Sequence, residues 1–280
     1  MPDLDILDLL DEQQRKDVLY AREHFLGGEN LSEHITPQEL EIVASYYKQQ
    51  TEDGTSRNIA TVVIGPPGAG KSTLIGLINE KCKDAGYEQL GILSDCDELK
   101  PKITALYPDK DLDSDDVHRK SRDLQDVLRD QIYENEDSFV QPILGLPRQR
   151  VAAFVGEASK QGYDVNLISV EISSEKSVQR VADRLGETRD DQGNPTGQYT
   201  DPEWAYDAAA ELVGVYDFCK QHLSEQLNGY ALYNNENISP VLVEAHNFPY
   251  AKNKEYEEES RLEIIRLENN WDRGEKYIER

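Results

Sequence analysis

Short apolar runs rich in β-branched residues alternate along the chain with longer segments in which apolar residues recur at helical spacing. The runs that predict strands lie at residues 59–64, 87–94, 138–145, 164–171 and 230–234, with a further edge strand at Leu242-Val243. Helical spacing follows at residues 74–78, 117–133, 146–158, 173–185 and 203–227. This alternation predicts an α/β fold, with a mostly parallel sheet flanked by helices.

The two ends of the chain depart from this alternation. Residues 1–57 are predicted to be helical, and Thr36 and Glu39 have the spacing of a capping box at the start of a second helix. We expect this N-terminal extension to pack on the core as a helical layer rather than to fold as a separate module. Residues 238–280 are predicted to form a charged C-terminal extension, in which the strongly charged residues 252–280 predict a peripheral helix or an interaction tail. Residues 58–237 form the predicted core.

A glycine-rich loop follows the first predicted strand. Gly65, Gly70, Lys71 and Ser72 fit the pattern Gly-x-x-x-x-Gly-Lys-Ser, with the preceding strand and following helix that this motif requires. In such a loop backbone N–H groups surround phosphate oxygens, the lysine reaches the β- and γ-phosphates, and the hydroxyl binds Mg²⁺. The complete predicted ATP cradle is Gly65, Pro66, Pro67, Gly68, Ala69, Gly70, Lys71, Ser72 and Thr73. An ordinary glycine turn is the poorer interpretation in this context.

Two acidic residues, Asp95 and Asp97, end the second predicted strand. Ligands bind at the carboxyl ends of strands in open α/β sheets. A carboxylate placed there accepts the proton of an attacking hydroxyl or orients a Mg²⁺ complex. Because the chain is rich in acidic residues, solvated surface carboxylates remain the alternative interpretation.

Residues 186–198 form a polar, glycine-rich stretch that is long for a connection in an α/β unit, and this predicts a functional lid. Arg184 precedes the stretch and Arg189 lies within it. An arginine on a lid stabilises the charge that spreads over a transferring phosphate. The alternative for either arginine is an ion pair on the surface.

The net charge of the chain limits which classes of binding partner are expected. The 280 residues carry a net charge of −25, which disfavours long nucleic acids and anionic membranes as partners. The N-terminal residues lack the features of a signal peptide, so we expect a cytoplasmic protein, with export into a host cell as the alternative. Cations on one predicted helix either neutralise a bound phosphate or pair with nearby acids; they are His118, Arg119, Lys120 and Arg122.

Cysteine usage suggests neither disulfides nor a metal site. Cys82, Cys96 and Cys219 are odd in number and lack the spacing of metal ligands along the sequence. We interpret all of them as buried or idle thiols.

Several motifs in this order resemble the zeta toxin family of P-loop small-molecule kinases, over about Ile59 to Asn237. They are Gly65-Pro-Pro-Gly-Ala-Gly-Lys-Ser-Thr73, Asp95-Cys-Asp97, Ser138-Phe-Val140, Gly162-Tyr-Asp-Val165, Ser177-x-x-Arg-Val-Ala-Asp-Arg184 and Thr196-Gly-Gln-Tyr-Thr-Asp-Pro202. The resemblance implies a nucleotide-kinase-like fold and ATP-dependent phosphorylation of a sugar hydroxyl on a nucleotide-like metabolite, typically UDP-N-acetylglucosamine. It also implies a toxin or effector that is restrained by an antitoxin or inhibitor protein.

Residue by residue, the resemblance implies that Lys71 and Ser72 hold ATP and Mg²⁺, that Asp97 is the general base and that Arg184 contacts the phosphates of ATP. Asp95 is expected, from its place beside Asp97, to support the metal together with Ser72. Two positions depart from the family pattern. Gln141-Pro-Ile143 stands where the family commonly has a substrate-binding glutamate and threonine.

The second departure is Gln198, which stands where the lid of the family has an arginine, so a cationic contact depends on Arg189. The alternatives are therefore a kinase of another acceptor, such as a dinucleotide or a nucleic-acid end, and a degenerate nucleotide-binding interaction protein.

Overall fold

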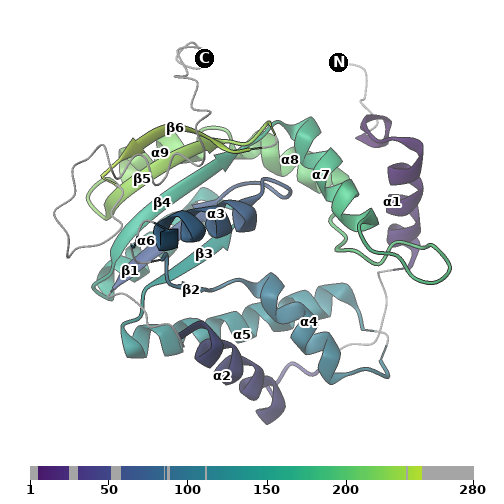
Figure 1. Cartoon of the computed structure of the whole chain (residues 1–280), viewed down its shortest axis with the longest axis horizontal. Coiled ribbons are helices and arrows are strands. Elements are labelled where there is room, and N and C mark those ends of the chain that lie inside the picture. The colour runs from purple at the N-terminus through teal and green to yellow at the C-terminus, as the bar shows by residue number, and fades with distance from the viewer. Residues whose placement is uncertain are drawn as a thin grey trace.

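The computed structural model describes residues 6–24, 31–51, 58–84, 86, 89–110, 112–237 and 239–247. At its centre lies a six-stranded sheet with the strand order β2-β3-β1-β4-β5-β6 (Figure 1). The strands are β1 Ile59–Ile64, β2 Ile92–Leu93, β3 Phe139–Ile143, β4 Asp164–Glu171, β5 Leu227–Asn234 and β6 Val241–His246. All adjacent pairs are parallel except β5 and β6, which confirms the predicted mostly parallel α/β fold.

Helices cover both faces of this sheet. They are α1 Glu12–His24, α2 Pro37–Thr51, α3 Lys71–Asp84, α4 Cys96–Leu106, α5 Ser114–Asn135, α6 Arg148–Lys160, α7 Ser174–Gly186, α8 Pro202–Leu212 and α9 Val215–His222, with a 3₁₀ turn η1 at Ile6–Leu9. Successive residues of β1 point to opposite faces, as strand geometry requires. Val62 packs in a cluster with residues of α4, α5, α6 and α9, whereas Val63 packs against α3. The buried β-branched run of β1 therefore carries both halves of the core.

Four elements differ from the sequence expectations. The predicted strand at 87–94 is regular only at Ile92–Leu93, and the predicted helix at 203–227 is two helices that break at Gly214, where φ is 83°. Helix α4 was not predicted, since Pro101 interrupts its pattern. The sheet continues through β6 beyond the predicted end of the core at residue 237.

The two N-terminal helices pack on different parts of the core. Helix α1 lies along α7, where Val18 and Ala21 are buried against Val178 and Ala182. Helix α2 packs on α4 and α5 instead (Figure 1).

At the start of α2 the predicted capping box is present. The Thr36 N–H donates to the Glu39 carboxylate at 2.7 Å, and the Glu39 N–H donates to the Thr36 hydroxyl at 3.3 Å. A packed helical layer is thus observed over the described part of the N-terminal extension. The predicted helix or tail at residues 252–280 lies outside the described residues. Among the described helices, none is both long and apolar enough to cross a membrane.

Candidate active site

The candidate site is a large cavity at the carboxyl ends of the parallel strands. Strand β1 lies between β3 and β4. From β1 the chain runs to β2 and β3 on one side and then crosses to β4 on the other, and crevices at such a switch point bind ligands. The cavity measures about 2320 Å³, well above the roughly 300–1,000 Å³ of a pocket for one small ligand. It has room for a nucleotide and a second substrate side by side.

The glycine-rich loop forms one wall of this cavity, with residues 67–73 lining it. Neighbouring atoms leave no room for side chains at two of its glycines. A Cβ atom at Gly65 would stand 2.7 Å from the Val170 carbonyl oxygen, and one at Gly70, where φ is 81°, would stand 2.6 Å from the Asn235 amide nitrogen. That amide donates to the Ala69 carbonyl at 2.7 Å and fixes the loop against the end of β5.

Lys71 begins α3 and folds back over the loop. Its Nζ donates to the Gly65 carbonyl at 2.8 Å and to the Pro66 carbonyl at 3.0 Å. Burial lowers the pKa of Lys71 to about 8, although the charges of Asp95 and Asp97 act in the opposite direction. A partly buried ammonium group without a direct carboxylate partner in the described residues is suited to bind an anionic phosphate.

The two acids predicted from the sequence lie in the cavity as an adjacent pair. Asp95 caps α4 by accepting a hydrogen bond from the Asp97 N–H at 3.0 Å, and it is buried. Burial and the neighbouring Asp97 raise the pKa of Asp95 to about 6. Asp97 is more open to the cavity, and Lys100 on the next turn of α4 contacts its Oδ1 at 2.6 Å.

The environment of Asp97 keeps its carboxylate ionised. Burial alone would raise the pKa of Asp97, but the ion pair with Lys100, a hydrogen bond from Gln198 and the charge of Arg184 outweigh it and lower that pKa. Of the two carboxylates, Asp97 is therefore the one charged throughout the neutral range.

The residues assigned to magnesium fit that ion. The exposed hydroxyl of Ser72 and the carboxylate of Asp95 both line the cavity next to the phosphate loop. Mg²⁺ prefers oxygen ligands and commonly uses one or two protein groups beside substrate phosphates. When bound, the ion would supply positive charge to the phosphates; the described residues suited to hold it there are Ser72 and Asp95.

The structure separates the two arginines that were predicted to act together. Arg184 lines the cavity and donates to the Thr200 hydroxyl at 3.0 Å, while its Nε is buried without a hydrogen-bond partner among the described residues. Arg189 instead forms a two-point ion pair with Asp17 of α1, at 3.0 and 2.6 Å, and is not among the lining residues. The structure thus contains an ion pair of Arg189, the alternative interpretation, although its Asp17 half is buried rather than on the surface.

Only part of the predicted lid borders the cavity, namely Glu187 and residues 196–198, and Gln198 reaches the candidate base. The Gly197 N–H donates to the Leu185 carbonyl at 3.1 Å, which holds the lid on the end of α7. The Gln198 side chain then donates to Asp97 Oδ2 at 3.2 Å. In this arrangement Lys100 engages one oxygen of Asp97 and Gln198 engages the other.

Several lining residues escaped the sequence analysis. Trp204 was assigned to a core-facing stripe, but it is 50% exposed and lines the cavity. Because other aromatic residues follow it in sequence, nothing in the sequence indicated that the Trp204 ring faces out of the core. Lys100 was missed because α4 was missed; its position three residues after Asp97 was the available clue.

The four cations on α5 lie in two different surroundings. His118 and Arg122 line the cavity. Arg119 pairs with Asp116 at 2.6 Å, and Lys120 is buried 3.5 Å from Glu39. Helical spacing separates the roles, since residues 118 and 122 share one face of the helix.

The comparison with protein families agrees with this geometry. The family described as zeta toxin matches residues 43–243. The chain belongs to the zeta toxin family. The match covers the phosphate loop, both acids, the lid and part of β6. A search of curated proteins by sequence found no match.

Solved structures share the fold at low identity. A chain of the PezAT chromosomal toxin–antitoxin system of Streptococcus pneumoniae is similar at 14% identity and a TM-score of 0.55, over 76% of this chain and 83% of that one. A complex of AvrRxo1-ORF1 and AvrRxo1-ORF2 with sulphate ions gives 16% identity and a TM-score of 0.56, over 89% and 82%. The same pair with ATP gives 16% and 0.52, over 92% and 74%. These likenesses support the zeta toxin fold of the chain.

Proposed function

We propose that this zeta toxin family member is an ATP-dependent kinase that phosphorylates a hydroxyl group of a small nucleotide-like metabolite, UDP-N-acetylglucosamine or a similar molecule. The observation that carries the proposal is the placement of Lys71 and Asp97 in one cavity that is large enough for two substrates. Lys71 faces the position of the ATP phosphates. Asp97, kept ionised by its neighbours, accepts the proton of the acceptor hydroxyl.

The charge of the cavity supports an anionic acceptor. The whole chain has 30 basic and 55 acidic residues, whereas lysines and arginines are as numerous as aspartates and glutamates in the lining of the cavity. Arg122 on α5 and Arg150 on α6 line the cavity, and neither has an ion-pair partner among the described residues. Arginine binds phosphate groups well because its guanidinium matches their geometry. A metabolite that carries its own phosphates is the ligand these residues suit.

The solved relatives add to the proposal. The AvrRxo1 complex was solved with ATP, which supports ATP as the phosphate donor here. The PezAT structure is a toxin–antitoxin system, which supports a toxin or effector role and an antitoxin or inhibitor protein as partner. We place the activity in the cytoplasm of the producing cell or of a host cell.

A metabolite screen tests the proposal. The purified chain is incubated with γ-labelled ATP, Mg²⁺ and a metabolite extract, and labelled products are separated and identified. Lys71→Ala and Asp97→Asn are run in parallel as controls. We expect a labelled nucleotide-like product with the native chain, loss of ATP binding in Lys71→Ala, and retained ATP binding without product in Asp97→Asn.

The same screen distinguishes the alternatives. A labelled dinucleotide or nucleic-acid end would show that the chain is a kinase with a different acceptor from the one proposed. ATP binding without any product would favour the degenerate interaction protein. The hydrogen bond from Gln198 to Asp97 favours the interaction protein, because it occupies a carboxylate oxygen that would have to accept the proton of the acceptor hydroxyl.

A further inference from the structure

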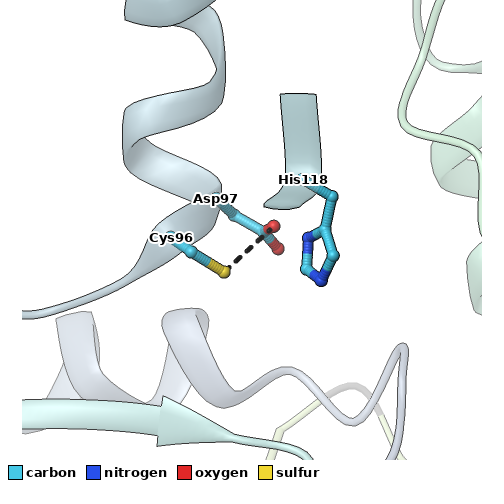
Figure 2. Close-up of side chains that lie close together, drawn as sticks. All are labelled: Cys96, Asp97 and His118. Carbon is cyan, nitrogen blue, oxygen red and sulfur yellow. Dashed lines mark hydrogen bonds between the residues drawn. The ribbon is translucent and has the colours of Figure 1, made fainter. Parts of the chain in front are cut away.

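Three side chains that are typical transition-metal ligands meet at one edge of the cavity. Cys96 and Asp97 begin α4, and His118 faces them from α5. The Cys96 sulfur, a carboxylate oxygen of Asp97 and a ring nitrogen of His118 all lie within 4.8 Å of one another. Figure 2 shows the three side chains pointing toward a common centre.

The spacing of these atoms is close to that of a bound ion. Zinc lies about 2.3 Å from sulfur and about 2.0–2.1 Å from nitrogen or oxygen, which separates tetrahedral ligands by roughly 3.5 Å. The Cys96 sulfur is 4.0 Å from Asp97 Oδ1. Small side-chain rotations would therefore bring the three atoms into a coordination sphere, without movement of either helix.

The chemistry of these ligands differs from that of the magnesium position. A thiolate and an imidazole select zinc, cobalt and related ions over Mg²⁺, which takes oxygen ligands. Ser72 and Asp95 offer oxygen only. All three residues of the Cys96 cluster border the cavity, so a fourth coordination position stays open to water.

We propose that Cys96, Asp97 and His118 form a second metal site, which binds Zn²⁺ or a similar ion and thereby inhibits the enzyme. On binding, the Cys96 thiol releases its proton to solvent and the thiolate bonds to the metal. The Asp97 oxygen exchanges the ammonium of Lys100, now 2.6 Å away, for the metal ion. With that oxygen coordinated, Asp97 no longer accepts the proton of an acceptor hydroxyl. The inhibitory part of the proposal rests on the proposed kinase function, whereas the binding part does not.

The binding part is tested without nucleotide or acceptor. The full chain is titrated with Co²⁺, and the absorption of a cobalt–thiolate bond is followed in the near ultraviolet. We expect saturation at one ion per chain, loss of the band in Cys96→Ser, binding weakened by about tenfold or more in His118→Ala, and displacement of Co²⁺ by Zn²⁺. Cys219→Ser is the matched control, because that thiol is fully buried in another part of the core and should not alter the titration.

Three results would overturn the binding part. They are the absence of a thiolate band, a band that survives Cys96→Ser, and an unchanged titration in His118→Ala. Retained ATP affinity in each variant shows that it has folded.

The inhibition is then measured as loss of phosphoryl transfer on addition of Zn²⁺ at saturating Mg²⁺. We expect the native chain to be inhibited and Cys96→Ser to resist. Equal sensitivity of the two would contradict the inhibitory role even if the cobalt titration succeeds. If the proposed kinase activity fails altogether, the cobalt titration still decides whether the site exists.

Discussion

Replacement of Lys71 by methionine should stabilise the unliganded protein at neutral pH while it abolishes ATP binding. Methionine keeps the unbranched shape of lysine and removes its charge. In the folded protein the Lys71 ammonium is partly buried, and burial lowers its pKa from 10.5 to about 8. Desolvation of this charge therefore costs free energy on folding. The methionine variant does not have that cost, because it has no charge to desolvate.

The structure gives the size of the effect. Each pKa unit corresponds to roughly 1.4 kcal/mol, so the fall from 10.5 to about 8 disfavours folding by roughly 3 kcal/mol when Lys71 is fully charged. Partial exposure to the cavity reduces this to roughly 2 kcal/mol. The variant also loses two hydrogen bonds from Nζ to the carbonyls of Gly65 and Pro66, which we take as roughly 1 kcal/mol in total. The expected net gain is about 1 kcal/mol at pH 7.

The pH dependence separates the charge from the hydrogen bonds. Below pH 8 the native lysine is charged in both states, and the full desolvation cost is present. Between pH 8 and 10.5 the unfolded chain holds the proton that the folded chain has lost, so the stability of the native protein rises with pH and the advantage of the variant shrinks. From pH 7 to pH 9.5 we expect the advantage of the variant to fall by roughly 1 kcal/mol, which removes most of it.

Urea unfolding at pH 7 and pH 9.5, with calorimetry for ATP, measures both effects. Lys83→Met, on the exposed side of the same helix α3, is the control for the loss of a lysine. A difference in unfolding free energy that does not change with pH would refute the desolvation argument. Undiminished ATP binding in Lys71→Met would refute the assignment of the phosphate loop.

Five further substitutions test other parts of the protein. Asp97→Asn should leave ATP affinity within a few-fold and lower transfer of label by roughly a hundredfold or more, because an amide does not accept the proton; a silent variant would remove Asp97 as the base. Arg184→Ala should weaken ATP binding in calorimetry, whereas Arg189→Ala should change it little, because only Arg184 lines the cavity; equal losses would contradict this separation. Gly197→Ala should speed hydrogen exchange of the lid amides by about tenfold or more while the fold persists, since its Cβ would stand 2.2 Å from the Arg184 carbonyl oxygen. Gly76→Ala in α3, with no atom within 4 Å of the added carbon, should raise the free energy of unfolding by roughly 0.5–1 kcal/mol; a drop in the urea midpoint would be the contrary result.

The features that the sequence predicted well depend on residues that are close together along the chain. The phosphate loop depends on glycines, Lys71 and Ser72 within one short stretch, and the capping box at Thr36 on a spacing of three residues. Asp95 and Asp97 could be placed because the end of a parallel strand has a fixed location relative to the sheet. In these cases local geometry leaves little freedom.

The features that it missed depend on residues far apart in the chain. Arg189 pairs with Asp17, which lies 172 residues earlier, so no local pattern could distinguish it from a lid arginine that faces phosphate. Cys96 was interpreted as an idle thiol because metal ligands were sought by spacing along the sequence. Its neighbour His118 comes from another helix, and only the packing of α4 on α5 brings them together.

The two helices of the N-terminal extension contact opposite sides of the cavity. The Asp17 side chain ties α1 to the lid, while α2 packs on α4 and α5 across the opening (Figure 1). An opening of the lid therefore has to break the Asp17–Arg189 pair or shift α1 from its packing on α7, which would change its distance from α2. The distance between α1 and α2 therefore reports on the position of the lid. It can be measured with probes on the exposed faces of the two helices, so that no residue lining the cavity is altered.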